Sequence, residues 1–445
     1  MLNKNYFIYG KLQYIIILII YIVLFFFKND LLLIFLFIYS IFLGRVLLRN
    51  KNFLIYNTAS FLLIILFLYG IFNSILEIIN GPLDYSTYIA TIVYASAIPT
   101  YVIGFNLGSK INISSSKRKN NSDSKKIQKK SIIFCLLVLS VLLAYKSYSY
   151  YDAGYFFNSA AFQDKERWMF FLNFGQVDFV LGFLINGLFL FILFYNKKLL
   201  NHEKYFLIVL SVYYILLSIF SGNRRDILPI ILGGLWIFLE WREKKMDVKV
   251  WLFIISGIFI FNIIGILRSV GFKNDNKANL SEVQIIEQSM RANEFVYPFK
   301  TLIYEIDEYS KSKEKYKFLN GKSIFINSFK YFIPRFIYKN KPNSLADEFM
   351  IKHFGKDKKF GIAYTPVTEF FVNFGYLGPA VSFFFVGLLL SVLIKHKFFC
   401  FVFFTFTLDF CRGEIGTFIY MMIFILLPFF IVKILNNIRL NEKNY

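Results

Sequence analysis

The fold is decided by residues 205–241, which read YFLIVLSVYYILLSIFSGNRRDILPIILGGLWIFLEW. Two apolar runs flank a short polar hairpin, Ser221–Asp226. A helix needs about 20 mostly apolar residues to cross the hydrocarbon core of a bilayer, and irregular backbone is excluded from contact with lipid. The stretch therefore indicates two membrane-spanning helices joined by a hairpin at one membrane surface.

The same pattern recurs along the 445-residue chain, which is 57% hydrophobic and 18% charged and has a mean hydropathy of +0.54. Soluble domains average about 25% charged residues. We therefore predict an all-α polytopic membrane protein with about twelve transmembrane helices. The predicted spans lie at 12–27, 31–48, 53–79, 84–108, 131–145, 176–195, 205–221, 227–241, 250–267, 373–394, 398–411 and 415–435.

Lysine and arginine are distributed unequally between the two sides of the predicted bundle. With the N-terminus in the cytoplasm, the short inner segments hold 25 of these residues and the short outer loops hold 7, among them Lys146. Basic residues favour the cytoplasmic side, whereas long loops cross largely regardless of charge. Both termini are thus expected in the cytoplasm and the long loop, 268–372, outside it. This topology accounts for much of the net charge of +22, and we expect no nucleic acid partner.

The spans and loops divide the chain into five predicted segments. Two of them carry distinctive polar sequence: a basic linker, expected to be a disordered cytoplasmic anchor, and a large loop with 18 basic and 12 acidic residues. The segments are N-terminal transmembrane helices 1–108, the basic cytoplasmic linker 109–130, central transmembrane helices 131–267 with the outer arginine hairpin, the large extracytoplasmic loop 268–372, and C-terminal transmembrane helices 373–445.

Periodic apolar residues indicate that the large loop is ordered. Ser281 and Gln284 form a candidate capping box, and Pro298–Tyr309 is predicted to be a helix with one apolar face. Lys322–Tyr338 alternates aromatic and cationic residues, as in a helix that lies on the membrane surface. A simple cap over the bundle is the alternative interpretation of this loop.

Cysteine and histidine offer no metal site and no disulfide framework. The three histidines are far apart in sequence, and none of the three cysteines belongs to a CxxC pattern. We therefore predict no metal and no cofactor.

The hairpin between the two spans of residues 205–241 is the first candidate site. Arg224 and Arg225 lie at the outer membrane boundary, where neither is needed to anchor a cytoplasmic end. Guanidinium groups bind diphosphate oxygens in pairs, and a helix start adds free N–H groups. Asp226 is placed to cap that helix or to orient one arginine. Alternatively, the arginines extend to lipid headgroups.

Two further clusters lie in or beside the long loop. Residues 333–342, IPRFIYKNKP, hold Arg335, Lys339 and Lys341 between two prolines that restrict the backbone. Residues 365–379, TPVTEFFVNFGYLGP, place Glu369 and Asn373 on one face of a helix. Glycines at 375, 378 and 387 are expected to allow close helix packing.

Three of these landmarks, in this order and within a bundle with a large outer loop, carry a family resemblance. They are Gly222-x-Arg224, Pro334-Arg335-(x)5-Lys341-Pro342 and Glu369-(x)3-Asn373-Phe-Gly375-(x)2-Gly378. The chain resembles the bacterial O-antigen and capsule polymerases, the oligosaccharide repeat-unit polymerase (Wzy) family, most clearly over 205–435.

The resemblance implies a metal-independent membrane glycosyltransferase, similar in architecture (GT-C-like) to the O-antigen ligases. Such an enzyme moves a growing glycan from undecaprenyl diphosphate onto the next lipid-linked repeat unit, at the outer face of the bacterial cytoplasmic (inner) membrane. The partners implied are undecaprenyl-diphosphate-linked oligosaccharide, membrane lipid, a chain-length regulator and a flippase.

The residues expected to carry this chemistry fall into three groups. Glu369 is the first candidate for the base that accepts the sugar hydroxyl proton, followed by His353 and Asp226, although a glutamate at a helix start is often a cap. The resemblance transfers a diphosphate role to Arg224 and Arg335. The other predicted contacts are Arg225, Lys339, Lys341 and Arg412 for diphosphate, and Asn373 and Tyr338 for glycan.

Two other functions remain open on the sequence alone. An O-antigen ligase has the same architecture, and a ligase defect would leave long chains on undecaprenyl. A lipid-linked oligosaccharide flippase or other transporter often shows internal repeats and broken helices near mid-membrane. The sequence shows no internal repeat, and its unusual charges cluster at the outer boundary.

Overall fold

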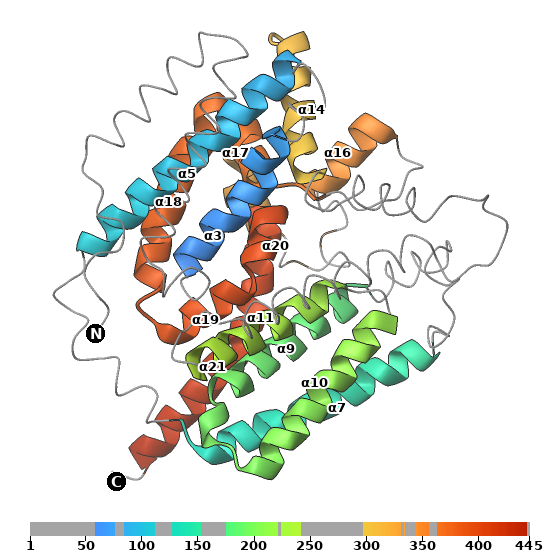
Figure 1. Ribbon diagram of the computed structural model, residues 1–445. Helices are drawn as coiled ribbons and strands as arrows, with labels where there is room; N and C mark the ends of the chain where they lie inside the picture. The colour runs from blue at the N-terminus through green and yellow to red at the C-terminus, as the bar shows by residue number, and fades with distance from the viewer. Residues whose placement is uncertain are drawn as a thin grey trace. The chain divides into compact units, whose positions relative to one another are not determined.

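The computed structural model describes residues 58–75, 84–111, 127–152, 175–220, 224–241, 297–330, 333, 338, 343–355 and 363–442 (Figure 1). Within these ranges every regular element is a helix, and no strand occurs. The predicted all-α class is therefore confirmed for the described chain. The predicted spans 12–27, 31–48 and 250–267, the candidate capping box and most of the linker lie outside it.

Among the residues that the structure describes, five helical segments are long and apolar enough to cross a membrane. They are Thr58–Ile75, Tyr85–Ser109, Lys129–Tyr151, Pro366–Leu393 and Ile415–Asn436. Apolar side chains also point outward at helical spacing, as Phe134, Leu137 and Val141 do on one helix. Such stripes are expected where a helix faces lipid. Both observations support a helical membrane protein.

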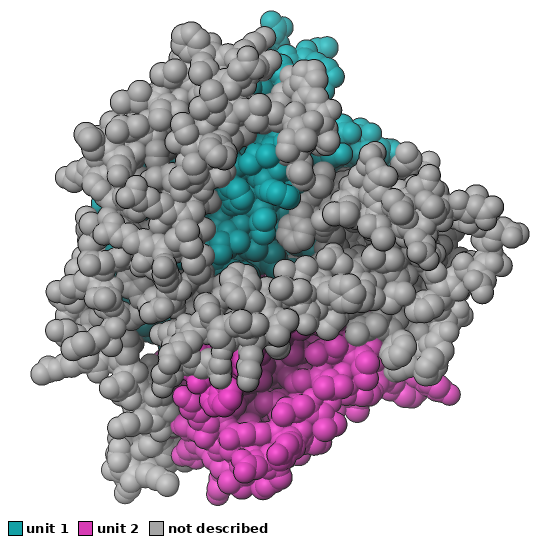
Figure 2. Space-filling model, viewed as in Figure 1, with its two compact units in different colours: residues 1–116, 292–400, 407–420 teal, residues 117–291, 401–406, 421–445 magenta. Residues whose placement is uncertain are grey.

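The described elements group into two compact units, shown in teal and magenta in Figure 2. The first unit comprises residues 1–116, 292–400 and 407–420, and the second comprises 117–291, 401–406 and 421–445. Neither unit is continuous in sequence. The five predicted segments therefore do not correspond one to one with the compact units.

In the first unit, α5 (Tyr85–Ile111) packs along α18 (Gly378–Leu393). Glycine makes this approach close enough for backbone contact. A Cβ on Gly104 would lie 1.9 Å from the Phe384 carbonyl oxygen, and one on Gly387 would lie 2.1 Å from the Tyr101 carbonyl oxygen. The predicted close packing at Gly387 is confirmed.

Other helices of this unit come from the predicted outer loop and from both ends of the chain. α14 (Tyr297–Lys311) matches the helix predicted at Pro298–Tyr309. Around these lie α3 (Thr58–Leu66), η1 (Phe67–Ile71), η4 (Ser323–Asn327), α15 (Ser328–Lys330), α16 (Leu345–Phe354), α17 (Pro366–Phe374), η5 (Gly375–Leu377) and α20 (Thr407–Arg412).

Of the predicted surface helix Lys322–Tyr338, residues 322–330 are helical. Ile333 lies in a bend and Tyr338 in no regular element, so the helix is shorter than predicted. Phe325 and Phe329 on it are exposed. Exposed aromatic side chains agree with a helix that lies on a membrane surface.

The second unit is built from α7 (Lys129–Asp152), α9 (Gly175–Phe194), η3 (Asn196–Lys198), α10 (Asn201–Phe220) and α11 (Arg224–Trp241). α19 (Lys397–Thr405) and α21 (Ile415–Glu442) contribute to both units. Trp236 of α11 packs against Phe401 and Phe404, with ring centroids 5.8 Å and 5.1 Å apart.

Three predicted spans need correction. The span 131–145 is too short, because α7 continues to Asp152 and places Lys146 inside the helix. The span 373–394 begins earlier, at Pro366, and is interrupted at Gly375, which has a φ of 70°. The span 398–411 is two short helices, α19 and α20, separated at Phe406. Hydropathy averages over turns, so it misses the breaks at Gly375 and Phe406, and the apolar run of α7 was ended at Lys146 although the helix continues.

Candidate functional site

The residues at the N-terminus of helix α17 favour the start of a helix at this position. The Thr365 side chain accepts a hydrogen bond from the Thr368 N–H at 3.1 Å, and Pro366 follows at the first helical position. Both features favour a helix start. Glu369 and Asn373, which the sequence predicted to share a face, lie four residues apart on this helix, and both are buried.

A serine that the sequence did not single out joins these two residues. The Ser323 hydroxyl donates to Glu369 Oε1 and accepts from Asn373 Nδ2, each at 2.7 Å. Asn373 Nδ2 also donates to the Glu369 carbonyl oxygen at 2.7 Å. The structure therefore brings the predicted base and a predicted glycan contact into one buried polar cluster.

Glu369 also caps another helix. Its Oε2 accepts the N–H of Ile415, the first residue of α21, at 2.7 Å. In the same way, Glu414 Oε1 accepts the N–H of Ala346 in the first turn of α16 at 2.7 Å. Carboxylates at helix starts satisfy free N–H groups and the positive end of the helix dipole. Both Glu369 oxygens are engaged, so a substrate hydroxyl reaches them only after one of these bonds opens.

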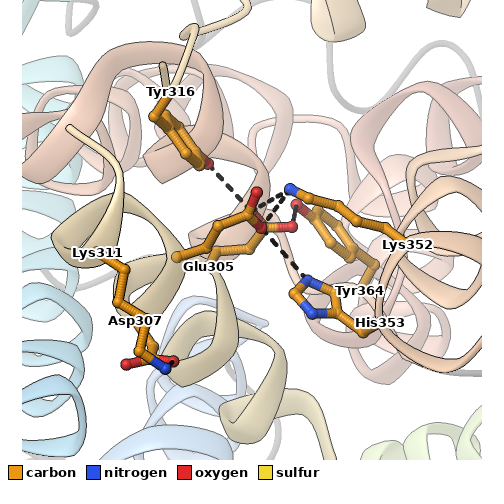
Figure 3. Close-up of polar contacts among 8 residues, drawn as sticks. Glu305, Asp307, Lys311, Tyr316, Lys352, His353 and Tyr364 are labelled. Atoms are coloured by element: carbon orange, nitrogen blue, oxygen red, sulfur yellow. Dashed lines mark hydrogen bonds and ion pairs between the residues drawn. The ribbon is translucent and has the colours of Figure 1, made fainter. Parts of the chain in front are cut away.

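A second cluster is centred on Glu305 of α14 (Figure 3). The hydroxyls of Tyr316 and Tyr364 donate to its two carboxylate oxygens at 3.0 Å and 3.3 Å. Lys352 Nζ lies 3.8 Å from Glu305 Oε2 and also pairs with Glu308. Burial raises the pKa of Glu305, and Lys352 and the tyrosine hydroxyl of Tyr316 oppose this shift.

His353 lies at the edge of this cluster. Its Nε2 is 3.6 Å from Glu308 Oε2, and its ring packs against Phe349 and Tyr304 at centroid distances of 4.4 Å and 5.4 Å. Partial burial, with help from the charge of Lys352, lowers the pKa of His353 below its usual value of 6.5. A neutral imidazole at pH 7 can accept a proton, so His353 has the protonation state of a general base.

Asp226, the third candidate base, lies in the first turn of α11 and forms an ion pair. Lys146 Nζ is 2.9 Å from its Oδ2, and both side chains are buried. The ammonium group also lies 5.6 Å from the ring centroids of Tyr150 and Tyr214. Gly182 of α9 lies beside the pair, and a Cβ there would be in ordinary van der Waals contact with Asp226 Oδ2, at 3.4 Å. This geometry fits an orienting role better than proton transfer.

The predicted diphosphate contacts are described only in part. Arg224 is the first residue of α11, as expected for a G-x-R motif that opens a helix, but the side chains of Arg224 and Arg225 lie outside the described atoms. Arg335, Lys339 and Lys341 lie outside the described residues. Arg412 ends α20 and is half-buried. Their diphosphate role stays a prediction.

Tyr338, the second predicted glycan contact, is also half-buried. The ammonium group of Lys330 lies 5.9 Å from the centroid of its ring. Among the described residues, no three His, Cys, Asp or Glu side chains are grouped so as to hold a metal ion.

Sequence reasoning missed several residues that build these clusters. A lysine inside a membrane-spanning helix costs free energy and commonly has a function. This signal would have identified Lys146 if the predicted span had included residue 146. Glu305 and Glu308 are three apart on a helix that the periodicity did predict, so their shared face was visible in the sequence. Tyr316, Tyr364 and Ser323 carried no comparable signal.

No protein-family model, curated protein sequence or solved structure matches this chain.

Proposed function

We propose that the protein is a membrane glycosyltransferase that polymerises lipid-linked oligosaccharide repeat units at the outer face of the bacterial cytoplasmic membrane. The observation that carries the proposal is His353, a partly exposed imidazole beside a carboxylate in the segment between two sets of apolar helices. A hydroxyl acceptor needs such a base, and no metal is required for it.

In this reaction a sugar hydroxyl of one repeat unit attacks the anomeric carbon of the glycan on a second lipid. The new glycosidic bond forms as the bond from that carbon to the diphosphate oxygen breaks, and the lipid diphosphate leaves. His353 Nε2 takes the proton of the attacking hydroxyl. Negative charge develops on the leaving diphosphate, and we assign its stabilisation to the positive charges of Arg224 and Arg335.

Helix α11 supports this assignment because its first turn is held in place. Asp226, two residues after Arg224, is tied to Lys146 of α7 by the buried ion pair. A fixed helix start presents its N–H groups and its positive dipole end in one direction, which suits an anionic leaving group. Asp226 is therefore assigned an orienting role, and Glu369 a capping role.

The test uses full-length protein in lipid nanodiscs and synthetic undecaprenyl diphosphate repeat units. A ladder of products that differ by one repeat unit is expected. His353→Ala should abolish most of the ladder, by about 10²–10⁴-fold in rate, as for loss of a general base. A folded wild-type protein that yields no ladder from the repeat unit of its own host would overturn the proposal.

Two other outcomes would reassign the function. Transfer of a preformed long glycan in a single step, without intermediate lengths, would identify a ligase. Movement of labelled lipid-linked glycan across a sealed vesicle, without any new glycosidic bond, would identify a transporter.

A further inference from the structure

Helices α14 and α16 meet at a surface that the proposed chemistry uses only at His353. Four side chains form this surface, which we name the α14–α16 surface: Tyr304, Glu308, Lys352 and His353. Their exposed fractions are 43% for Tyr304, 32% for Glu308, 44% for Lys352 and 17% for His353. All four side chains are therefore partly exposed, whereas the atoms His353 Nε2 and Glu308 Oε2 are themselves covered.

The surface is built on a fixed framework. Glu414 holds the first turn of α16 through the Ala346 N–H, and the Ser344 hydroxyl oxygen accepts from the Asp347 N–H. At the other end of α16, Lys352 pairs with Glu305 and Glu308 of α14. Groups that are already held in position lose little conformational freedom when a ligand binds.

Apolar packing fixes the two helices further. The buried Phe349 ring lies 5.9 Å from both Tyr304 and Tyr364, and 4.4 Å from His353, measured between centroids. Figure 3 shows Lys352 and His353 extending from α16 toward Glu305 of α14. The side chains of the α14–α16 surface are thus supported from beneath.

One polar atom of the surface, His353 Nε2, makes no hydrogen bond. It lies 3.6 Å from Glu308 Oε2, which is too long for a hydrogen bond, and that oxygen pairs with the ammonium group of Lys352. A sugar hydroxyl that donates to His353 Nε2 would satisfy this atom once the side chains that cover it move aside.

The mixture of charges restricts the ligand class. A phosphate would be repelled by Glu308 and by the neighbouring Glu305 carboxyl when ionised, and a cation would be repelled by Lys352. A neutral polyhydroxylated ring is repelled neither by the carboxylates nor by the ammonium group. Its hydroxyls can donate to Glu308 and accept from Lys352, while its apolar face packs on the exposed Tyr304 ring.

We propose that the α14–α16 surface binds a neutral sugar ring of the acceptor oligosaccharide. The inference rests on the proposed function and deepens it, because it names the site that presents the attacking hydroxyl to His353. Tyr304 supplies the packing surface, and Glu308 and Lys352 set the orientation of the ring.

The binding test uses full-length protein in nanodiscs and does not depend on turnover. One probe is the repeat-unit lipid extracted from host cells that lack this protein, and the other is undecaprenyl diphosphate without sugar. Hydrogen exchange is followed in peptides covering residues 297–311 and 345–354. The repeat-unit lipid is expected to slow exchange in both helices, and the sugar-free lipid is expected to leave it unchanged.

Variants locate the effect on the surface. Tyr304→Ala should weaken binding about tenfold, as for loss of an aromatic packing partner, and Tyr304→Phe should bind like the wild type. Glu308→Gln provides a second test if Tyr304→Ala does not fold. The matched control is Lys311→Ala on the same helix, whose ammonium group pairs with Asp307, away from the cluster in Figure 3.

The outcomes separate this inference from the proposed function. Equal protection by the sugar-free lipid, or wild-type affinity in both Tyr304→Ala and Glu308→Gln, would overturn the sugar site. Sugar-dependent protection in a wild-type protein that makes no ladder would support the sugar site and remove the polymerase assignment.

Discussion

Lys146 and Asp226 form an ion pair of 2.9 Å between α7 and α11, with side-chain exposures of only 1% and 9%. The free energy needed to remove two charged groups from water often exceeds the free energy gained from their attraction. A buried ion pair is therefore weak evidence of a role in stability alone. Its position beside the start of α11, where the Gly222-x-Arg224 motif lies, connects it to the proposed diphosphate site. The pair is therefore expected to orient the helix start.

Replacing one member of this pair should be much worse than replacing both. Lys146→Met leaves Asp226 charged and buried without its partner, which should lower the free energy of unfolding by about 3–5 kcal/mol. The double variant Lys146→Met with Asp226→Leu should recover most of that loss. Denaturant titration in detergent micelles measures both.

A matched control comes from the exposed pair Lys311–Asp307, where Lys311→Met should change stability by less than about 1 kcal/mol. If the double variant is as stable as the wild type and also makes full-length polymer, the pair has no orienting role. If it is stable but its products stop at one repeat unit, the orienting role is supported.

Replacing a glycine at the α5–α18 contact, even by alanine, should destabilise the protein. A methyl group at Gly104 or Gly387 would overlap a backbone carbonyl oxygen, at 1.9 Å and 2.1 Å. Neither helix can yield without displacing the other, so Gly387→Ala should cost about 1–3 kcal/mol or more. Thermal unfolding of the purified protein measures the loss.

Gly234 of α11 is the control for this prediction, because nothing lies within 4 Å of a Cβ built there. Gly234→Ala should be neutral or stabilising by up to about 1 kcal/mol, since alanine favours helix. Equal effects of the two substitutions would show that α5 and α18 are not in backbone contact.

Glu369 can be tested as a cap against its alternative role as a base. Glu369→Gln keeps an oxygen that can accept from Ile415, whereas Glu369→Ala removes the acceptors for both Ser323 and Ile415. We expect Glu369→Ala to cost about 2–6 kcal/mol, at about 1–3 kcal/mol for each of the two groups left without a partner. We expect Glu369→Gln to fold and to retain the polymer ladder. A folded Glu369→Gln protein without a ladder would make Glu369 the base.

The sequence predicted the helical membrane class and the shared face of Glu369 and Asn373 because both depend on local periodicity. It could not predict the partners that complete each cluster. Ser323 is 46 residues from Glu369, Tyr364 is 59 from Glu305, and Lys146 is 80 from Asp226. Contacts at such separations are set by how helices pack, which hydropathy does not encode.

The sequence also did not predict the full length of the helix α7. Lys146 ended the apolar run in the sequence, so it was counted with the outer loops, yet α7 continues past it. A lysine inside a membrane helix needs a polar partner, and here that partner is Asp226 on α11, which a sequence window around residue 146 does not contain. The ion pair with Asp226 is therefore the reason why α7 extends beyond its predicted end at residue 145.

The pH dependence of polymerisation should report the ionisation of His353. Its pKa lies below 6.5, first because of partial burial and second because of Lys352. The protonated imidazole cannot accept the hydroxyl proton, so the rate of ladder formation should be constant near pH 7 and fall as the pH drops below 6.5. Lys352→Met removes the positive charge that disfavours protonation, so the pKa should rise and the falling limb should move to higher pH. Lys311→Met, on the same helix as Glu308 but outside the cluster, should leave the limb in place. A limb that does not move in Lys352→Met, or a profile that is flat down to pH 5, would remove His353 from the role of base.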